Sequence, residues 1–248
     1  MASQHSEHCF TAAAQSGTPV GRQEEIASVQ TYVSEPKNPS ESKAVILYFS
    51  DVFGPFIIHN QLTMDYYASH GFTVLGLDYF FGEPMQDCMN KPDFDRAAWM
   101  EKAYSNAKTH TRPWVDAVVK KYGSDKKYCA VGFCFGGPPV FNLAKEDGLI
   151  VCGAIAHPAA PSEELTEIDE CTVPILFSCA ETDRTFPRET RRKVEDRLVE
   201  QKKTYYFQIF SGVNHGFAVR CDPNVENERW AKEECQRGMV AWFKRFTA

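Results

Sequence analysis

The stretch that decides the fold covers residues 128–137 and reads YCAVGFCFGG. An apolar run over 127–133 leads directly into the pattern Gly-x-Cys-x-Gly-Gly, which is typical of a sharp turn from a strand into a helix. Such a turn strains its central residue, and small residues two positions before and after let strand and helix pass closely. Gly132 and Gly136 stand at these two positions. The pattern therefore predicts that Cys134 projects from the carboxyl end of a strand.

Three features of this turn favour a reactive thiol. The side chain would lie at a helix N-terminus, where backbone N–H groups without partners stabilise a thiolate. The backbone N–H of Phe135 would be one donor of an oxyanion hole. Pro138 and Pro139 are tolerated, because N–H groups in the first helical turn have no internal partner. The alternative is a tight turn around a cysteine that is merely buried, and the pattern alone leaves both interpretations open.

Short apolar runs alternate with helical patterns along the whole chain. Further runs of strand length lie at 26–33, 44–49, 72–77, 149–156, 173–179 and 204–210. Helical patterns lie at 57–70, 94–122, 188–201 and 227–246, the second with a break expected at Pro113. This alternation predicts an α/β fold, a doubly wound and mostly parallel sheet with helices on both faces. We expect one domain over 16–248 after a flexible arm over 1–15, and ligands at the carboxyl ends of the strands.

The composition excludes several classes of protein. The 248 residues include 27 Lys and Arg against 33 Asp and Glu, a net charge of −6, which argues against binding to a nucleic-acid backbone. No apolar stretch reaches the roughly 20 residues that span a bilayer, and no secretory signal is recognisable. The nine cysteines form no C-x-x-C pair, so a zinc or dithiol site has little support. We expect a soluble, cytoplasmic protein without a metal.

A cysteine nucleophile needs a base, and the base needs an orienting carboxylate. For this type of turn the chain order is nucleophile, acid, histidine. Asp183 follows the apolar run 173–179, and His215 follows the run 204–210 in a loop that contains glycines. Cys134, Asp183 and His215 therefore lie after three strand runs in the required order, and we expect them to form a catalytic triad.

Both partners of the thiol have alternatives in the sequence. Glu181 could be the carboxylate instead of Asp183, which could also cap the helix that follows. Other histidines lie after a strand run or in a predicted helix, namely His157, His59 and His70. We favour His215, because it follows the last strand run and lies between glycines.

The loop after the run 44–49 is expected to supply the second oxyanion donor. This position falls on the backbone N–H of Val52. Asp51 beside it would place a carboxylate near the thiol, although an ordinary turn residue explains it equally well. Phe53 belongs to a group of aromatic residues in the loops around the expected site, which suggests a mostly apolar pocket.

At this point the chain resembles the dienelactone hydrolase family. The resemblance rests on the cysteine turn, the Asp183 loop, the segment NHGFAVR at 214–220 and the loop DVFG at 51–54. It implies an α/β-hydrolase fold and a Cys-His-Asp triad that hydrolyses esters or lactones without a metal or organic cofactor. In this family a glutamate near the oxyanion loop helps control ionisation of the thiol, and this sequence has Asp51 there, which is one methylene shorter; whether Asp51 takes over that role is left open by the sequence. Arg220 resembles an arginine with which the family binds acidic lactones. We therefore expect Asp51, Phe53 and Arg220 to contact the substrate.

These observations together predict an ester or lactone hydrolase for an aromatic or polyketide-like substrate. One alternative is an enzyme that releases or cyclises a thioester-bound product in a biosynthetic pathway. A non-catalytic small-molecule binder on the same fold is a second, and a redox sensor that uses the many cysteines is a third. We expect a small-molecule partner and no nucleic acid or membrane, and the sequence leaves a homodimer open.

Overall fold

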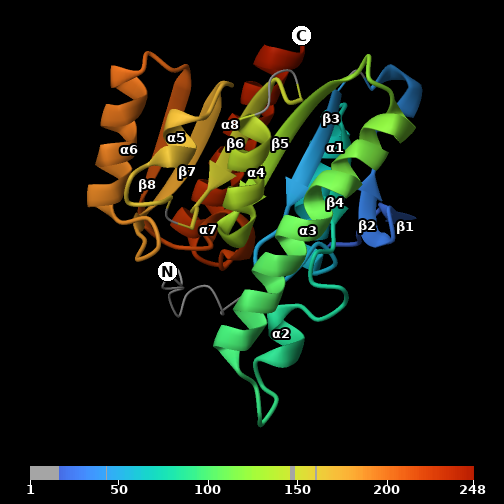
Figure 1. The fold of residues 1–248 in the computed structure, drawn as a ribbon, viewed down its shortest axis with the longest axis horizontal. Helices are drawn as coiled ribbons and strands as arrows, with labels where there is room; N and C mark the ends of the chain where they lie inside the picture. The colour runs from blue at the N-terminus through green and yellow to red at the C-terminus, as the bar shows by residue number, and fades with distance from the viewer. Residues whose placement is uncertain (1–16, 43, 146–148, 160) are drawn as a thin grey trace.

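The computed structural model describes residues 17–42, 44–145, 149–159 and 161–248, and the predicted arm over 1–15 lies outside them. The described strands form one sheet in the order β1-β2-β4-β3-β5-β6-β7-β8 (Figure 1). Their bounds are β1 Arg22–Ile26, β2 Val29–Ser34, β3 Ala44–Phe49, β4 Thr73–Leu77, β5 Lys127–Phe133, β6 Cys152–Ala156, β7 Ile175–Thr182 and β8 Tyr205–Asn214. β2 is antiparallel to β1 and β4, and the other pairs are parallel. This arrangement confirms the predicted mostly parallel sheet.

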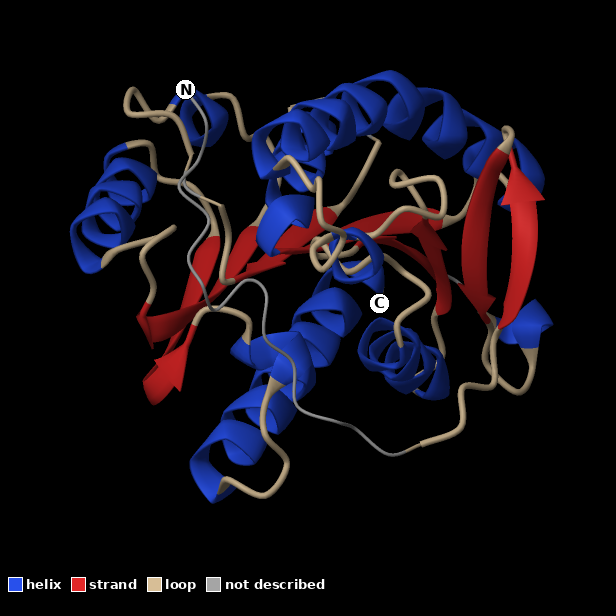
Figure 2. Cartoon of the chain, turned by 90° about the horizontal axis from the view of Figure 1, so that it is seen from below, coloured by secondary structure: helices blue, strands red, loops and turns tan. Residues whose placement is uncertain are grey.

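The helices cover both faces of the sheet (Figure 2). Their bounds are α1 Ile58–Ser69, α2 Met85–Cys88, α3 Arg96–Tyr122, α4 Gly137–Ala144, α5 Thr166–Asp169, α6 Arg188–Glu200, α7 Phe217–Arg220 and α8 Glu226–Thr247, with short 3-10 helices at Pro39–Glu41 and Cys134–Gly136. Within the described ranges, no helix combines the length and apolar character needed to cross a membrane.

The alternation of side chains along the central strands builds two cores. Along β3, Val45 and Leu47 pack into the core under α3, α4 and α6, whereas Ile46 and Tyr48 pack into the core under α1 and α8. Successive residues of a strand point to opposite faces, so a strand buried on both sides must be apolar throughout. This requirement explains why the run AVILYF at 44–49 has no polar member inside the strand except the tyrosine hydroxyl.

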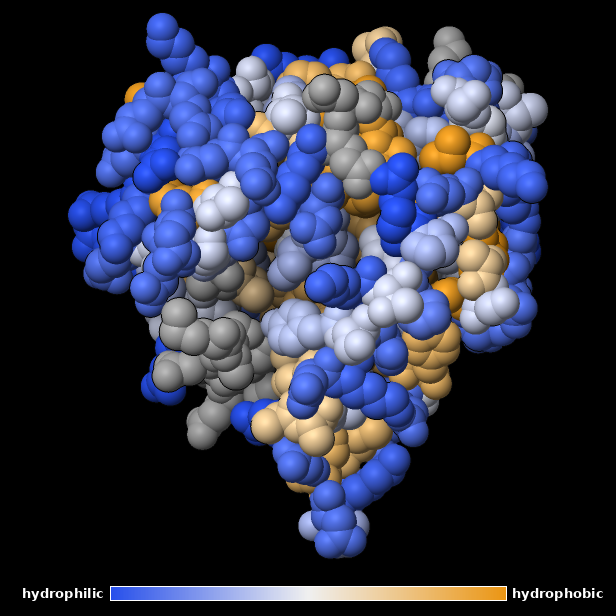
Figure 3. Space-filling view, viewed as in Figure 1, coloured by the Kyte–Doolittle hydropathy of each residue, from blue (hydrophilic) through white to orange (hydrophobic). Residues whose placement is uncertain are grey.

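Apolar side chains also gather at the lower end of the molecule, below the sheet in the view of Figure 1. Figure 3 shows apolar side chains gathered where α2 lies beside the beginning of α3. There the ring of Trp99 stacks on Phe80 with centroids 5.1 Å apart, and its indole N–H donates to the carbonyl of Glu83. The beginning of α3 is thus packed against the loop that follows β4.

Two predictions about the secondary structure were wrong, one about a strand and one about a helix break. The run 26–33 is not a single strand. It contains the last residue of β1, a turn at Ala27 and Ser28, and most of β2, because both turn residues have positive φ, 50° and 60°, and reverse the chain. The usual Asn-Gly signal of such a turn is missing, which concealed it. The break expected at Pro113 is also absent, since α3 continues through this residue. Buried side chains on both sides of the proline, including Ala107 and Trp114, hold the helix on the sheet despite the lost hydrogen bond.

Candidate active site

The turn after β5 has the geometry that its glycines predict. Cys134 has a φ of 53°, a left-handed conformation that is rare outside glycine. A Cβ on Gly132 would lie 2.2 Å from the carbonyl oxygen of Gly136. A Cβ on Gly136 would lie 2.1 Å from the carbonyl oxygen of Phe49 in the neighbouring strand. Neither position accepts a side chain, so both glycines are required by close approach of the backbone.

The helix that follows the turn begins where the sequence predicts. α4 starts at Gly137, and Pro138 and Pro139 occupy its first turn. The prolines remove no helical hydrogen bond there, because N–H groups at these positions have no internal acceptor. Cys134 therefore lies between the end of a central strand and the beginning of a helix.

Asp183 and His215 form a buried pair at the ends of β7 and β8. His215 Nδ1 lies 2.8 Å from Asp183 Oδ2, and the two side chains are 1% and 2% exposed. A carboxylate can only accept, so Nδ1 is the protonated ring nitrogen and the carboxylate fixes the tautomer. Glu181, the alternative carboxylate, is exposed and accepts instead from the backbone N–H of Gly212.

Thr185 is part of this network, and the sequence analysis missed it. Its Oγ1 lies 2.7 Å from Asp183 Oδ1, 2.9 Å from His215 Nδ1 and 3.1 Å from the carbonyl oxygen of Pro158. Oδ1 of Asp183 also accepts from the backbone N–H groups of Thr185 and Phe186. The spacing Asp-x-Thr after a strand, which is typical of a local side-chain turn, was the available signal.

The loop after β6 connects the cysteine turn to the histidine. The N–H of Ala159 donates to the carbonyl oxygen of Cys134 at 3.2 Å. In the same loop, the buried His157 packs edge-on against His215, with ring centroids 4.9 Å apart. The carbonyl oxygen of Pro158, between them, lies 3.1 Å from the hydroxyl oxygen of Thr185. One short loop therefore contacts both the proposed nucleophile turn and the His215–Asp183 pair.

The remaining candidate histidines lie away from this loop. His59 is buried within α1, and His70 follows its last residue. The His70 ring packs at a tilt against Tyr66, and its Nδ1 lies 2.8 Å from the carbonyl oxygen of that tyrosine. His157 lies next to His215, yet it is His215 that contacts the carboxylate of Asp183.

Asp51 and Arg220 form a second buried ion pair. Arg220 Nε lies 2.8 Å from Asp51 Oδ2, and the side chains are 1% and 0% exposed. The guanidinium also lies over the ring of Phe53, 4.7 Å from its centroid. Oδ1 of Asp51 accepts from the Phe53 N–H and from Asn60 Nδ2 at 3.2 and 3.1 Å. The three residues expected to contact the substrate therefore form one cluster.

Gly216 makes room for this cluster. Its φ is 94°, and a Cβ on it would lie 2.7 Å from Nη2 of Arg220. The glycine between His215 and α7 thus allows the arginine of α7 to turn back towards Asp51.

The two expected oxyanion donors follow neighbouring strands. Val52 lies after β3, and Phe135 lies after β5. The two strands pair in parallel, with Phe49 opposite Gly132, so both backbone N–H groups lie in loops at the carboxyl end of the sheet. Both residues are buried.

Tyr79 lies against both loops. Its hydroxyl donates to the carbonyl oxygen of Ser50, and its ring lies 5.2 Å from that of Phe135. Burial raises the pKa of Tyr79 well above its usual value, and the negative charges of Asp51 and of a Cys134 thiolate raise it further. Tyr79 therefore stays a neutral hydrogen-bond donor beside the cysteine turn.

Comparison with known proteins decides the family. Residues 29–247 match the model of the dienelactone hydrolase family. The chain belongs to the dienelactone hydrolase family. Dienlactone hydrolase 1 from Gibberella moniliformis is 35% identical over 232 residues, covering 91% of this chain and 88% of the relative. Hydrolase tropI from Talaromyces stipitatus is 32% identical over 247 residues, covering 96% and 95%.

Solved structures show the same fold. A dienelactone hydrolase-like protein from Klebsiella pneumoniae has a TM-score of 0.75 at 16% identity, covering 92% of this chain and 99% of that one. The chain thus has the α/β-hydrolase fold, and as a member of the dienelactone hydrolase family it is an ester or lactone hydrolase.

Two cavities of this dienelactone hydrolase family member differ in their distance from the candidate residues: one borders the cysteine turn, and the other lies away from it. One, of about 330 Å³, lies between α3 and α4 and borders Phe135. The other, of about 660 Å³, lies at the amino ends of β3 and β4, opposite the cysteine turn, and is bordered by Ser42 and Asp65. Among the described residues, no group of three or more His, Cys, Asp and Glu side chains is arranged to hold a metal ion.

Proposed function

We propose that this hydrolase cleaves a carboxylic ester or lactone through a Cys134 thiolate and a thioester acyl-enzyme. The observation that carries the proposal is the left-handed Cys134 turn, linked through one loop to the buried His215–Asp183 pair. A nucleophile, a base and an orienting carboxylate are the groups that acyl transfer requires.

The first half of the reaction forms the thioester. His215 takes the proton of the Cys134 thiol, and the sulfur attacks the substrate carbonyl carbon. The carbon–sulfur bond forms, the carbon–oxygen bond to the leaving group breaks, and the imidazolium returns the proton to the departing oxygen. Asp183 stabilises the imidazolium and keeps its orientation, with Thr185 accepting from Nδ1 and donating to Asp183 Oδ1.

The second half uses water. His215 removes a proton from a water molecule, whose oxygen attacks the thioester carbon. The carbon–sulfur bond breaks, the acid product leaves, and the proton returns to sulfur. The backbone N–H groups of Val52 and Phe135 stabilise the negative oxygen in both halves, an effect of about 3 kcal/mol per donor in other enzymes.

The surroundings of the turn favour a substrate with an aromatic or polyketide-like body. Aromatic rings pack together beside the turn, namely Tyr79, Phe80, Trp99, Tyr104 and Phe135. The charge of Arg220 is balanced by Asp51, and the pair offers a polar anchor next to the Phe53 ring. An apolar substrate with one polar group suits this combination.

A substrate panel tests the proposed function. We expect wild-type protein to turn over aryl esters or aromatic lactones faster than acyl thioesters, and His215→Ala to lose this activity. Preference for acyl thioesters would favour a product-releasing enzyme. Binding of an aromatic lactone by calorimetry without turnover of any ester, lactone or thioester would contradict a hydrolase and support a binding protein.

A further inference from the structure

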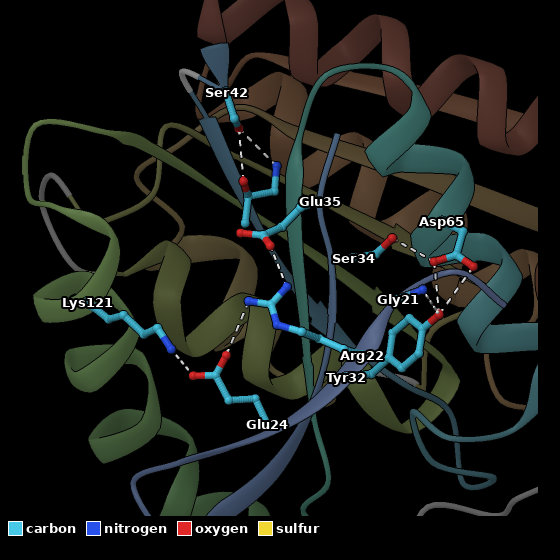
Figure 4. Close-up of polar contacts among 10 residues, drawn as sticks. Gly21, Arg22, Glu24, Tyr32, Ser34, Glu35, Ser42, Asp65 and Lys121 are labelled. Atoms are coloured by element: carbon cyan, nitrogen blue, oxygen red, sulfur yellow. Dashed lines mark hydrogen bonds and ion pairs between the residues drawn. The ribbon is translucent and has the colours of Figure 1, made fainter. Parts of the chain in front are cut away.

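The two edges of the sheet are built differently. At the β1 edge, the strand carries three charged residues in five, Arg22, Glu24 and Glu25. Figure 4 shows Arg22 paired with Glu24 and Glu35, and Lys121 of α3 paired with Glu24. Charges on an edge strand prevent it from pairing with another chain. The β1 edge is therefore closed by charge.

The β8 edge has no such protection. Its first six residues read YYFQIF and contain no charge, no proline and no glycine. The N–H of Ile175 in β7 donates to the carbonyl oxygen of Thr204, so alternate residues of β8 turn their polar groups towards β7. Tyr205, Phe207 and Ile209 consequently turn their N–H and C=O groups outward, where the sheet order places no further strand among the described residues.

Exposed apolar side chains gather at this same edge. Seven large hydrophobic side chains are exposed in the described part of the chain, and two of them, Val20 and Phe81, lie elsewhere. The other five lie at the end of α6, in β8, and just before or near the beginning of α8, namely Val199, Tyr206, Ile209, Val225 and Trp230. They lie in or beside an edge strand, on both faces of the sheet, and exposed apolar side chains next to an open strand are typical of an interface.

The beginning of α8 lies directly beside the end of β8. Trp230 packs on Phe210 with ring centroids 5.8 Å apart. Asn227 Nδ2 donates to the carbonyl oxygen of Ser211 at 2.9 Å. The exposed apolar side chains therefore lie along the edge strand and at its two ends, and we call β8 together with Val199, Val225 and Trp230 the β8 edge.

We propose that the β8 edge binds the β8 edge of a second copy of this chain. The two strands pair antiparallel about a two-fold axis at Phe207, so that Tyr205 of each copy faces Ile209 of the other. All three outward residues then exchange N–H and C=O bonds with the partner copy. The sheet continues from one copy into the next, and both apolar patches are covered.

The distribution of charge favours a second copy over an unrelated protein. Lys202 and Lys203 precede β8, whereas the first turn of α8 at the other end of the strand carries Glu226 and Glu228. Antiparallel pairing about a two-fold axis brings the basic end of each copy to the acidic end of the other. The surface is therefore complementary to itself in backbone, apolar contact and charge. This inference is independent of the catalytic chemistry.

Sedimentation velocity of the full chain tests the proposal. At roughly 1 to 100 µM, a range that covers moderate affinities, we expect the wild-type protein to form a dimer. Ile209→Lys places two charges in the paired edges and is expected to weaken the dimer by about a hundredfold or more. Gln23→Lys, an exposed position of the β1 edge, is the matched control and should leave the dimer intact. Esterase activity per chain should not change in either variant.

Amide hydrogen exchange of the wild-type protein gives a second test that needs no variant. The amides of Tyr205, Phe207 and Ile209 should exchange more slowly as concentration rises, while those of β1 should not change. A wild-type monomer at every concentration would overturn the proposal. A dimer that Ile209→Lys leaves unchanged would also overturn it, since it would place the interface elsewhere.

Discussion

Two thiol sites, one within β5 and one just after it, show what distinguishes a candidate nucleophile from a core residue. Cys129 lies inside β5 and faces Cys152 of β6, with sulfur atoms 3.6 Å apart. Cys134 lies just past the end of β5, and all three side chains are fully buried. Exposure therefore does not separate them. The difference lies in the backbone. The extended strand places Cys129 in the core beside Cys152. The turn with positive φ places Cys134 at the carboxyl end of the strands, where Asp183 and His215 also lie.

Burial keeps the core thiol of Cys129 protonated. It raises the pKa of Cys129 well above its usual value, and the neighbouring Cys152 raises it further. A thiol that stays protonated is a poor nucleophile. We infer that Cys129 and Cys152 serve as small apolar residues, and that any reactivity of Cys134 must come from its histidine, its helix N-terminus and its oxyanion donors.

Substituting each thiol gives the largest expected difference. Cys134→Ala should lower kcat/KM for an aryl ester by about 10⁴-fold or more, because the covalent step is lost. Cys129→Ala should stay within about twofold of wild type, since it removes only a core atom. Steady-state kinetics of purified variants checks both, with circular dichroism as the control for folding. Equal losses in both variants would remove the distinction between the two sites.

The carboxylate partner gives the next largest effect. Asp183→Asn should lower kcat by about 10³-fold, because an amide no longer fixes the His215 tautomer or stabilises its charged form. Glu181→Gln, at the end of β7 two positions before Asp183, should change kcat little, since Glu181 accepts from the N–H of Gly212. The pair of kinetic measurements distinguishes the two carboxylates. A larger loss in the glutamine variant would transfer the role to Glu181.

Thr185 should have a smaller effect. Thr185→Val keeps the shape but removes the hydroxyl that bridges Asp183 and His215, and we expect kcat to fall by about tenfold to a hundredfold. Thr185→Ser keeps the hydroxyl and should recover most of this loss. The pH dependence of kcat is the decisive readout, because loss of the bridge should also move the apparent pKa of the essential base. A valine variant with unchanged kinetics would mean that the bridge is structural only.

The paired core cysteines should give the smallest effect on function and a measurable one on stability. Cys152→Ala leaves a space of one sulfur atom in a tightly packed core, which costs about 1 kcal/mol in free energy of unfolding. Activity should be unchanged. Urea denaturation followed by fluorescence measures the stability, and the ester assay measures the activity. A loss of activity without a loss of stability would show that this pair takes part in the chemistry.

Much of the fold could be predicted from the sequence because strands buried on both faces must be apolar throughout. The run 44–49 coincides with β3, and 127–133 coincides with β5. The turn at Cys134 was also predictable from packing, because the backbone approaches Gly132 and Gly136 so closely that no residue with a Cβ fits there. The hairpin at 27–28 was hidden, because its reversal depends on backbone angles that Ala and Ser do not signal.

Partners that are distant in sequence were harder to predict. Cys134, Asp183 and His215 could be predicted as partners because each follows a strand, and a parallel sheet brings the carboxyl ends of its strands together. The ion pair between Asp51 and Arg220 did not follow, since it depends on how α7 turns after Gly216. Thr185 was missed for the same reason: its hydroxyl bonds to three groups from three different loops.

Mass spectrometry of the protein after brief exposure to a slowly hydrolysed aryl ester tests the central claim most directly. The account predicts that the chain gains the mass of the acyl group, that the gain maps to the peptide containing Cys134, and that it decays as acid product appears. The Cys134→Ala variant should show no gain, while Cys129→Ala should behave as wild type. Steady turnover with no adduct on Cys134, or an adduct on another residue that decays at the rate of turnover, would contradict the account.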